Sequence, residues 1–222
     1  MSGVVFAPYR LVLATGNPGK WAEFKALLSG LQLDLILQSD RGVSACDEPH
    51  ATFVENALAK ARHASRHTSL PALADDSGLC VRALYGAPGV RSARYAQVDG
   101  ARAARAMQDA ANNSLLLDSL AEAADRSAHF VCVLAAVRRA DDPEPLIAHG
   151  WLHGQIATSA AGEGGFGYDP LLVLPTSGLT LAQLPAEQKN RISHRARAVG
   201  QMQQLLQAFW GVLPSGATTG PT

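Results

Sequence analysis

The sequence of 222 residues is poor in cysteine and has no long apolar run. Its cysteines are Cys46, Cys80 and Cys132, and no two of them form a C-x-x-C pair. An odd number without such a pair argues against a disulfide framework or a thiolate metal site, so reduced cysteines are expected. No stretch is apolar and long enough to span a membrane, and no signal peptide is visible. We therefore expect a cytoplasmic protein with no membrane partner.

An excess of charge of one sign is also lacking. Lys and Arg number 19, Asp and Glu number 19, and the isoelectric point is near 7.1. Proteins that bind nucleic acid over a broad surface usually carry surplus Lys and Arg on one face. We therefore expect no nucleic-acid partner, and any phosphate binding should be focused in a cleft. With 47% hydrophobic and 17% charged residues, the chain is expected to be ordered.

Segments typical of strands and helices mix along the whole chain, which predicts a single α/β domain over residues 1–222 with a central sheet. Short apolar runs predict strands over residues 10–15, 33–37, 72–75, 79–84, 128–138 and 170–174. The segment 145–157 reads as two strands or a bent hairpin. Helical spacing predicts helices from 18, from 52 to about 67, over 99–124, from about 180 and over 193–210. The core should cover about 10–210, with a flexible tail over 212–222.

The first cluster that suggests chemistry is T-G-N-P-G-K, formed by Thr15, Gly16, Asn17, Pro18, Gly19 and Lys20. It joins an apolar strand to a helix, which Asn17 should cap and Pro18 should begin. N–H groups at a helix start bind anions, and Lys20 adds a positive charge where the helix dipole disfavours one. The loop matches neither G-x-x-x-x-G-K-[ST] nor G-x-G-x-x-G. An ordinary capped helix with a surface lysine explains it equally well.

A second cluster, A-D-D-S-G, holds Asp75, Asp76 and Ser77 at the end of an apolar run. Adjacent carboxylates repel each other, and such a pair often serves a hard cation such as Mg²⁺ or supplies a general base. Asp, Ser and Gly also form turns, so a polar turn explains the same residues. Upstream, Glu55 closes a T-x-x-E capping box with Thr52, and this cap competes with a role as metal ligand.

Two further clusters lie in the second half of the chain. G-G-F-G-Y-D contains Phe166, Gly167, Tyr168 and Asp169; its glycines allow close backbone approach and its rings could stack on a base. A Gly-rich turn with aromatic rings in the core is the competing interpretation. K-N-R-I-S-H-R contains Lys189, His194 and Arg195, with Ser193 as a candidate helix cap. Its basic residues suit phosphate or carbonyl oxygens, unless they form a solvated basic face.

The order of the motifs is more specific than any one of them. T-G-N-x-x-K, F-x-E-N-A, A-D-D-S-G-L, G-A-P-G-x-x-S-A-R-Y, G-G-F-G-Y-D-P and K-x-x-I-S-H-R follow one another from about Leu11 to Leu206. In this the chain resembles the inosine triphosphate pyrophosphatase family, called dITP/XTP pyrophosphatases in bacteria. The resemblance implies hydrolysis of ITP, dITP and XTP to the monophosphate and pyrophosphate. It also implies Mg²⁺, a homodimer, and an elongated mixed sheet flanked by helices, with two lobes and a cleft between them.

The resemblance also implies roles for individual residues. Asp76 would be the proton acceptor and a metal ligand, and Glu55 the second ligand. The substrate-binding residues would be Thr15, Gly16, Asn17, Pro18, Gly19, Lys20, Ser77, Phe166, Gly167, Tyr168, Asp169, Lys189, His194 and Arg195. In this scheme Lys20 and Lys189 stabilise the polyphosphate and Phe166 stacks on the purine. His194 and Arg195 then read the oxygen at position six of the base.

Two positions depart from the family pattern, and two other functions stay open. Ala196 stands where many relatives have Gly, and Gln183 stands where many have Glu. The nearest alternative is a related nucleotide pyrophosphatase acting on other modified nucleotides. A non-catalytic nucleotide-binding protein is the second, although Lys20, Glu55 and Asp76 argue against it because a sensor needs no base to activate water.

Overall fold

The computed structural model describes residues 7–96 and 105–216. Its strands are β1 (Tyr9–Ala14), β2 (Leu33–Leu37), β3 (Ala72–Val81), β4 (Ser127–Val137), β5 (Leu146–Ile156) and β6 (Leu172–Val173). Its α-helices are α1 (Pro18–Leu27), α2 (Phe53–Thr68), α3 (Arg105–Ser119), α4 (Ala186–Ile192) and α5 (His194–Trp210). Short 3₁₀ helices are η1 (Gln38–Arg41), η2 (Arg82–Leu84), η3 (Gly89–Arg94) and η4 (Leu181–Gln183).

The described strands form a six-stranded sheet in the order β2-β1-β3-β4-β5-β6. β1 pairs in parallel with both β2 and β3, whereas β5 and β6 are antiparallel, so the sheet is mixed. The chain divides into two compact units. Unit 1 contains residues 1–76, 133–149 and 198–222, and unit 2 contains 77–132 and 150–197. The predicted mixed α/β fold with flanking helices is confirmed, and the predicted cleft between lobes stays a prediction.

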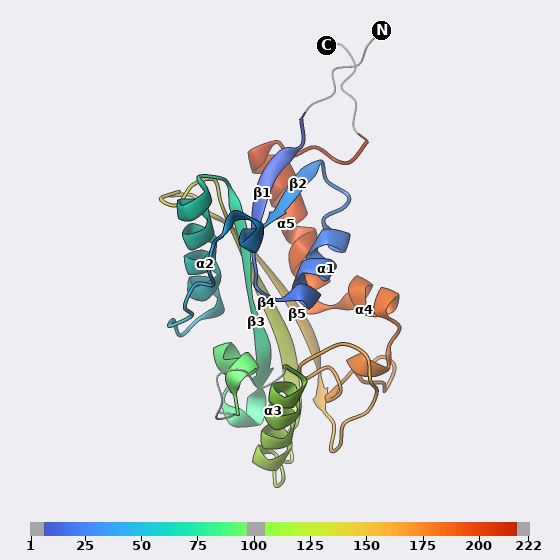
Figure 1. The fold of residues 1–222 in the computed structure, drawn as a ribbon. Helices are drawn as coiled ribbons and strands as arrows, with labels where there is room; N and C mark the ends of the chain where they lie inside the picture. Colours follow the sequence, from blue (N-terminus) through green and yellow to red (C-terminus); the bar gives the residue numbers. More distant parts are fainter. Residues whose placement is uncertain (1–6, 97–104, 217–222) are drawn as a thin grey trace. The chain divides into compact units, whose positions relative to one another are not determined.

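Unit 1 is organised around β1, whose residues Leu11 to Ala14 are all buried. Such a continuous buried run is expected for a parallel strand that is covered on both faces. Figure 1 shows α2 on one side of β1 and α1, with the unit 1 part of α5, on the other. The buried residues of α2 include Ala57, Ala61 and Ala64, small side chains at helical spacing that let the helix approach the strands closely.

Unit 2 has its own apolar core. Its buried side chains are Leu79, Val81, Leu116, Leu120, Ala128, Phe130, Leu152, Ile156, Tyr168, Leu171, Leu172, Leu174, Leu181 and Leu184. In β5, buried and more exposed residues alternate strictly along the strand, which leaves one face toward solvent. The core therefore lies on one side of this strand and fixes the segments that carry the second-half motifs.

Two predictions about secondary structure are wrong. Residues 72–84 contain no turn at Asp75 to Gly78; β3 runs unbroken from Ala72 to Val81, because buried partners on helices satisfy its polar side chains. Residues 145–157 form one long strand, β5, instead of two strands or a hairpin. The first residues of the helix predicted over 99–124, and the end of the predicted tail (217–222), lie outside the described residues. No described helix is long and apolar enough to cross a membrane.

Candidate functional site

The T-G-N-P-G-K segment forms the predicted strand-to-helix turn between β1 and α1. The Asn17 side chain caps α1 by accepting from the N–H groups of Gly19 (2.9 Å) and Lys20 (3.3 Å). Thr15 is buried, and its hydroxyl oxygen accepts from the Asn17 N–H at 3.2 Å. The exposed residues of the turn are Gly16, Pro18 and Gly19. Since Asn17 already binds two backbone donors of the helix start, the charge of Lys20 is the turn's main attraction for an anion.

Lys20 reaches from α1 to β3. Its Nζ lies 2.6 Å from Oδ2 of Asp75, whose side chain is only 2% exposed. Successive side chains of a strand point to opposite faces of the sheet. The contacts agree with this rule, because Asp75 meets a lysine of α1 whereas the next residue, Asp76, meets side chains of α2. The two adjacent carboxylates therefore have separate cationic partners.

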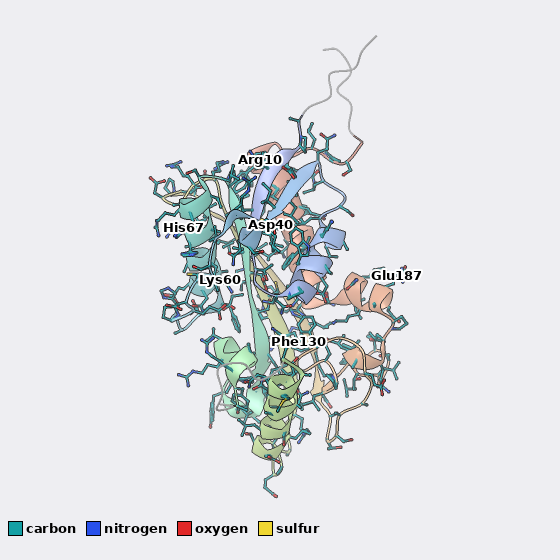
Figure 2. All side chains as sticks on the ribbon, viewed as in Figure 1. Arg10, Asp40, Lys60, His67, Phe130 and Glu187 are labelled. Carbon is teal, nitrogen blue, oxygen red and sulfur yellow. The ribbon has the colours of Figure 1, made fainter. Side chains whose placement is uncertain are left out.

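Asp76 lies at the centre of a polar cluster on the α2 side. Asn56 Nδ2 donates to its Oδ2 at 3.1 Å, and Lys60 Nζ lies 3.4 Å from its Oδ1. The same ammonium lies 2.7 Å from Oε1 of Glu48, so Lys60 joins two carboxylates that are far apart in sequence. Figure 2 labels Lys60 on α2. Together with the Lys20–Asp75 pair, the cluster holds three carboxylates and two lysines, so its formal charge is −1.

Burial and these charges shift the protonation of the cluster. Burial raises the pKa of Asp76, and the nearby Glu48 adds to this, while the Lys60 and Lys20 ammonium groups oppose it. Burial alone would lower the pKa of Lys60, but the carboxylates of Asp75, Asp76 and Glu48 outweigh it and raise that pKa. Lys60 thus stays protonated at neutral pH. Asp76 is a carboxylate with increased proton affinity, a property that suits a general base.

Glu55 is placed differently from the other carboxylates. It is exposed at the start of α2, where its N–H donates to Thr52 Oγ1 at 3.3 Å and its Oε2 accepts from the Thr52 hydroxyl at 2.6 Å. Thr52 is therefore the predicted N-cap, but Glu55 binds the Thr52 hydroxyl and not its backbone N–H, so the reciprocal bond of the predicted capping box is not formed. Among the described residues no hydrogen bond or ion pair joins Glu55 to Asp76, and its role as metal ligand stays a prediction.

The residues of the Asp76 cluster fit a hard divalent cation. Carboxylate oxygens are the ligands that Mg²⁺ prefers, and the cluster carries a surplus negative charge next to a buried Asp. No group of three or more His, Cys, Asp or Glu within 7–96 and 105–216 is arranged as a complete metal site.

The Phe166 turn of unit 2 is built on a buried ion pair. Lys189 Nζ lies 2.7 Å from Oδ2 of Asp169, and the same oxygen accepts from the Phe166 N–H at 2.9 Å. Gly165 has φ +80°, and a Cβ there would overlap the Asp169 carboxylate and lie 2.9 Å from Lys189 Nζ. Glycine is therefore required at this position both for its backbone conformation and for space.

Three cations surround the half-buried ring of Phe166. Lys189 Nζ lies 4.9 Å from the ring centroid, and the guanidinium carbons of Arg195 and Arg105 lie at 5.5 and 5.7 Å. These distances are typical of cation–π contacts. Burial raises the pKa of Asp169, although the charge of Lys189 acts in the opposite direction. Lys189 thus lies beside the aromatic ring, and its predicted role at the polyphosphate stays a prediction.

The remaining predicted residues of unit 2 lie around the same turn. Arg195 (2% exposed) and His194 (5% exposed) begin α5, whose third residue, Ala196, donates its N–H to Ser193 Oγ at 3.1 Å. The His194 ring stacks on Phe130, labelled in Figure 2, with ring centroids 4.8 Å apart. Ser193 is therefore the predicted cap, and burial of two basic side chains favours a ligand-binding role over a solvated face.

Tyr168 and Ser77 complete the set of predicted residues. Tyr168 is 3% exposed, its hydroxyl donates to the Ser92 carbonyl at 3.0 Å, and burial raises its pKa. Its ring belongs to the core, so of the two rings in this motif Phe166 is the one that can offer a stacking face. Ser77 is half-buried in β3 directly after Asp76. Gln183 forms a capping box with Thr180, so the departure at this position preserves the local structure.

Three residues with direct contacts were missed from the sequence. Glu48 and Lys60 were not singled out, although both contact the Asp76 cluster. Asn56 lies within the F-x-E-N-A motif but was given no role; it donates to Asp76 and also to the His50 carbonyl at 3.3 Å. The available signal was the spacing, because a Lys four residues after an Asn on a helix lies on the same face.

Comparison with known proteins gives consistent matches over nearly the whole chain. A model of the Ham1 family matches residues 11–205. A dITP/XTP pyrophosphatase of Bordetella pertussis is 61% identical, covering 90% of this chain and 92% of its own. One of Ralstonia nicotianae is 57% identical, covering 90% and 98%. The solved structure of a HAM1 protein from Coxiella burnetii is 45% identical, with a TM-score of 0.82 over 90% of this chain and 98% of its own.

Proposed function

Because the chain belongs to the Ham1 family, we propose that it hydrolyses the non-canonical purine triphosphates ITP, dITP and XTP to the monophosphate and pyrophosphate. The observation that carries this proposal is Asp76, a buried carboxylate with raised pKa beside Lys60, in a chain whose relatives are named dITP/XTP pyrophosphatase. Removal of these nucleotides from the nucleotide pool is the corresponding cellular role.

The unit 1 residues would act on the phosphates and on water. Asp76 orients the attacking water and takes its proton, and burial raises its affinity for that proton. Lys60 and Asn56 hold the Asp76 carboxylate in place through its two oxygens. Lys20, held at Asp75, supplies positive charge next to the T-G-N-P-G-K turn and stabilises charge that develops on the departing pyrophosphate.

Mg²⁺ is the cofactor in this proposal, and Asp76 and Glu48 are the residues that would hold it. Both carboxylates share Lys60, which places them around one cationic group. When bound, the ion would neutralise phosphate charge and orient the triphosphate. Glu55, predicted as a ligand from the family resemblance, is the competing candidate, and the two assignments are separable by experiment.

The unit 2 residues would read the purine base. Phe166 stacks on the purine, and Arg195 and His194 supply buried donors for the oxygen at position six. Adenine carries an amino group at that position, so a site built for an oxygen rejects it. Lys189 forms an ion pair with Asp169 and supports the Phe166 turn, and its predicted contact with the polyphosphate is a separate part of the proposal.

The family resemblance supports two further parts of the proposal, a homodimer and a cytoplasmic location. The dimer is tested by measuring mass in solution with light scattering, where a mass near 23.3 kDa would contradict it. We also propose no nucleic-acid partner, since the chain carries no net charge.

The proposed substrate range predicts the outcome of a steady-state comparison. With Mg²⁺ present, kcat/KM for ITP and XTP should exceed that for ATP by about a hundredfold or more, because an unpaired buried donor penalises adenine. GTP should also be a poorer substrate than ITP, as the family resemblance implies. Equal kcat/KM for ATP and ITP would contradict the assigned selectivity.

A matched pair of variants tests which glutamate serves the metal. Glu48→Gln should raise the Mg²⁺ concentration for half-maximal activity at least about tenfold, since it removes a ligand. Glu55→Gln should leave that concentration unchanged, because the Gln amide oxygen can still accept from the Thr52 hydroxyl at the start of α2. Both variants are titrated with Mg²⁺ at saturating ITP. The opposite result, a shift in Glu55→Gln alone, would return the role to Glu55.

A further inference from the structure

One face of α3 carries polar side chains that the proposed function has not used. Arg105, Asp109 and Asn113 follow one another at intervals of four residues, so they lie along the same side of the helix. All three belong to unit 2, together with the Phe166 turn. The sequence pattern R-x-x-x-D-x-x-x-N is the only sign of this face in the sequence.

Two of these side chains bind the backbone of Gly167 directly. The Gly167 N–H donates to Asp109 Oδ2 at 2.9 Å, and Asn113 Nδ2 donates to the Gly167 carbonyl oxygen at 3.1 Å. Gly167 has φ +64°, a conformation that glycine adopts readily. Both polar groups of this residue are therefore fixed by α3, directly after the aromatic residue assigned to the base.

The third side chain of this face, Arg105, lies near both Asp109 and the Phe166 ring. Arg105 Nε lies 4.0 Å from Asp109 Oδ2, and its guanidinium carbon lies 5.7 Å from the Phe166 ring centroid. Asn113 Oδ1 is buried and has no hydrogen-bond partner within the part of the chain that the structure describes. In the opposite orientation of the amide, Asn113 Oδ1 would face the Gly167 carbonyl oxygen, and two acceptors cannot form a hydrogen bond. The hydrogen bond to Gly167 therefore fixes the orientation of the Asn113 amide.

The residues on either side of Gly167 are held by other contacts. Phe166 N–H donates to Asp169, while the Tyr168 hydroxyl and Asn112 Nδ2 both donate to the Ser92 carbonyl, at 3.0 and 3.2 Å. Without the α3 side chains, the turn would keep the hydrogen bonds of Phe166 N–H and the Tyr168 hydroxyl but lose both hydrogen bonds of Gly167. The ring of Phe166 would then have freedom to rotate and shift.

We propose that Asp109 and Asn113 are positioning residues that set discrimination between purine bases by fixing Gly167 and, through it, the Phe166 ring. This inference rests on the proposed role of Phe166 as the stacking partner of the base. A small displacement of a side chain that contacts the substrate can strongly weaken discrimination between similar substrates. Loss of either side chain therefore acts on base recognition and leaves the hydrolytic step at Asp76 intact.

The kinetic test compares Asp109→Ala and Asn113→Ala with wild type on ITP and GTP. Each should raise KM for ITP about fivefold to tenfold and reduce the ratio of kcat/KM for ITP over GTP, with kcat little changed. Asp109→Asn keeps an oxygen that can accept from Gly167, so it should restore most of the wild-type values. Asp118→Ala is the control, since Asp118 is exposed elsewhere on the same helix.

Amide hydrogen exchange without nucleotide provides a readout independent of catalysis. Peptides that cover residues 163–169 should exchange faster in Asp109→Ala than in wild type or Asp118→Ala. Unchanged exchange, or an active enzyme whose KM and selectivity are the same in Asp109→Ala and Asn113→Ala, would overturn this inference alone. Wild-type protein that fails to hydrolyse ITP would instead overturn the proposed function, whatever the exchange rates.

Discussion

Asp76→Asn is expected to lower kcat for ITP hydrolysis by about 10²–10⁴-fold, the usual contribution of a positioned general base. Asn keeps the shape of the side chain but cannot take a proton, and it removes the charge that faces Lys60. The measurement is steady-state pyrophosphate release at saturating ITP and Mg²⁺. Asp34→Asn is the control, because Asp34 is exposed and forms an ion pair with the exposed Arg10, away from the Asp76 cluster. Turnover of Asp76→Asn within about tenfold of wild type would contradict the role.

The same variant should not be destabilised at neutral pH. Burial raises the pKa of Asp76 in the folded protein, so the folded state binds this proton more tightly than the unfolded state does. Ionisation of Asp76 therefore lowers stability as pH rises from the unfolded pKa through the folded one. The neutral Asn avoids this loss, and a thermal melt at pH 7 should give a Tm equal to or above that of wild type. Function and stability are thus opposed at this residue.

The second large effect is on stability. Lys189→Met should lower the free energy of unfolding by about 3–5 kcal/mol, because it leaves the buried carboxylate of Asp169 without its ammonium partner. The measurement is urea denaturation at pH 7. Lys25→Met, at an exposed position of α1, is the control and should change stability by less than about 0.5 kcal/mol. A loss below about 1 kcal/mol in Lys189→Met would show that the ion pair is not structurally important.

The pH dependence of this loss identifies its cause. The Lys189 charge opposes the effect of burial on Asp169, so removing it raises the folded pKa of Asp169 further above the unfolded value. The stability deficit of Lys189→Met should be full above the folded pKa and shrink as pH falls through it, since protonation neutralises the buried group. The double variant Lys189→Met with Asp169→Asn should recover much of the deficit at pH 7. A deficit that is independent of pH would indicate lost packing instead.

The sequence predicts best where local signals agree. The turn from β1 to α1 is an example, because an apolar run, Asn17 as cap and Pro18 in the first turn all indicate the same structure. The N-cap of α2 at Thr52 is another. The family resemblance added the mixed sheet, which no single segment reveals.

The errors arise where contacts distant in sequence outweigh local preference. Asp75 to Gly78 are turn formers, yet strand pairing and the buried partners Lys20 and Asn56 keep β3 extended. Glu48 is joined to Asp76 through Lys60 across 28 residues of sequence, a distance over which spacing rules carry no information. The segment around Glu48 reads as a plain loop. Its contribution to the site is visible only in three dimensions.

The most direct test of the central claim is the identity of the products formed from ITP with Mg²⁺. The account predicts inosine monophosphate and inorganic pyrophosphate in equal amounts, with no orthophosphate, when the reaction is followed by ³¹P NMR. Asp76→Asn should abolish both signals over the same period. Release of orthophosphate with inosine diphosphate by the wild-type protein would contradict the account, because it would place the cleaved bond beyond the β-phosphate.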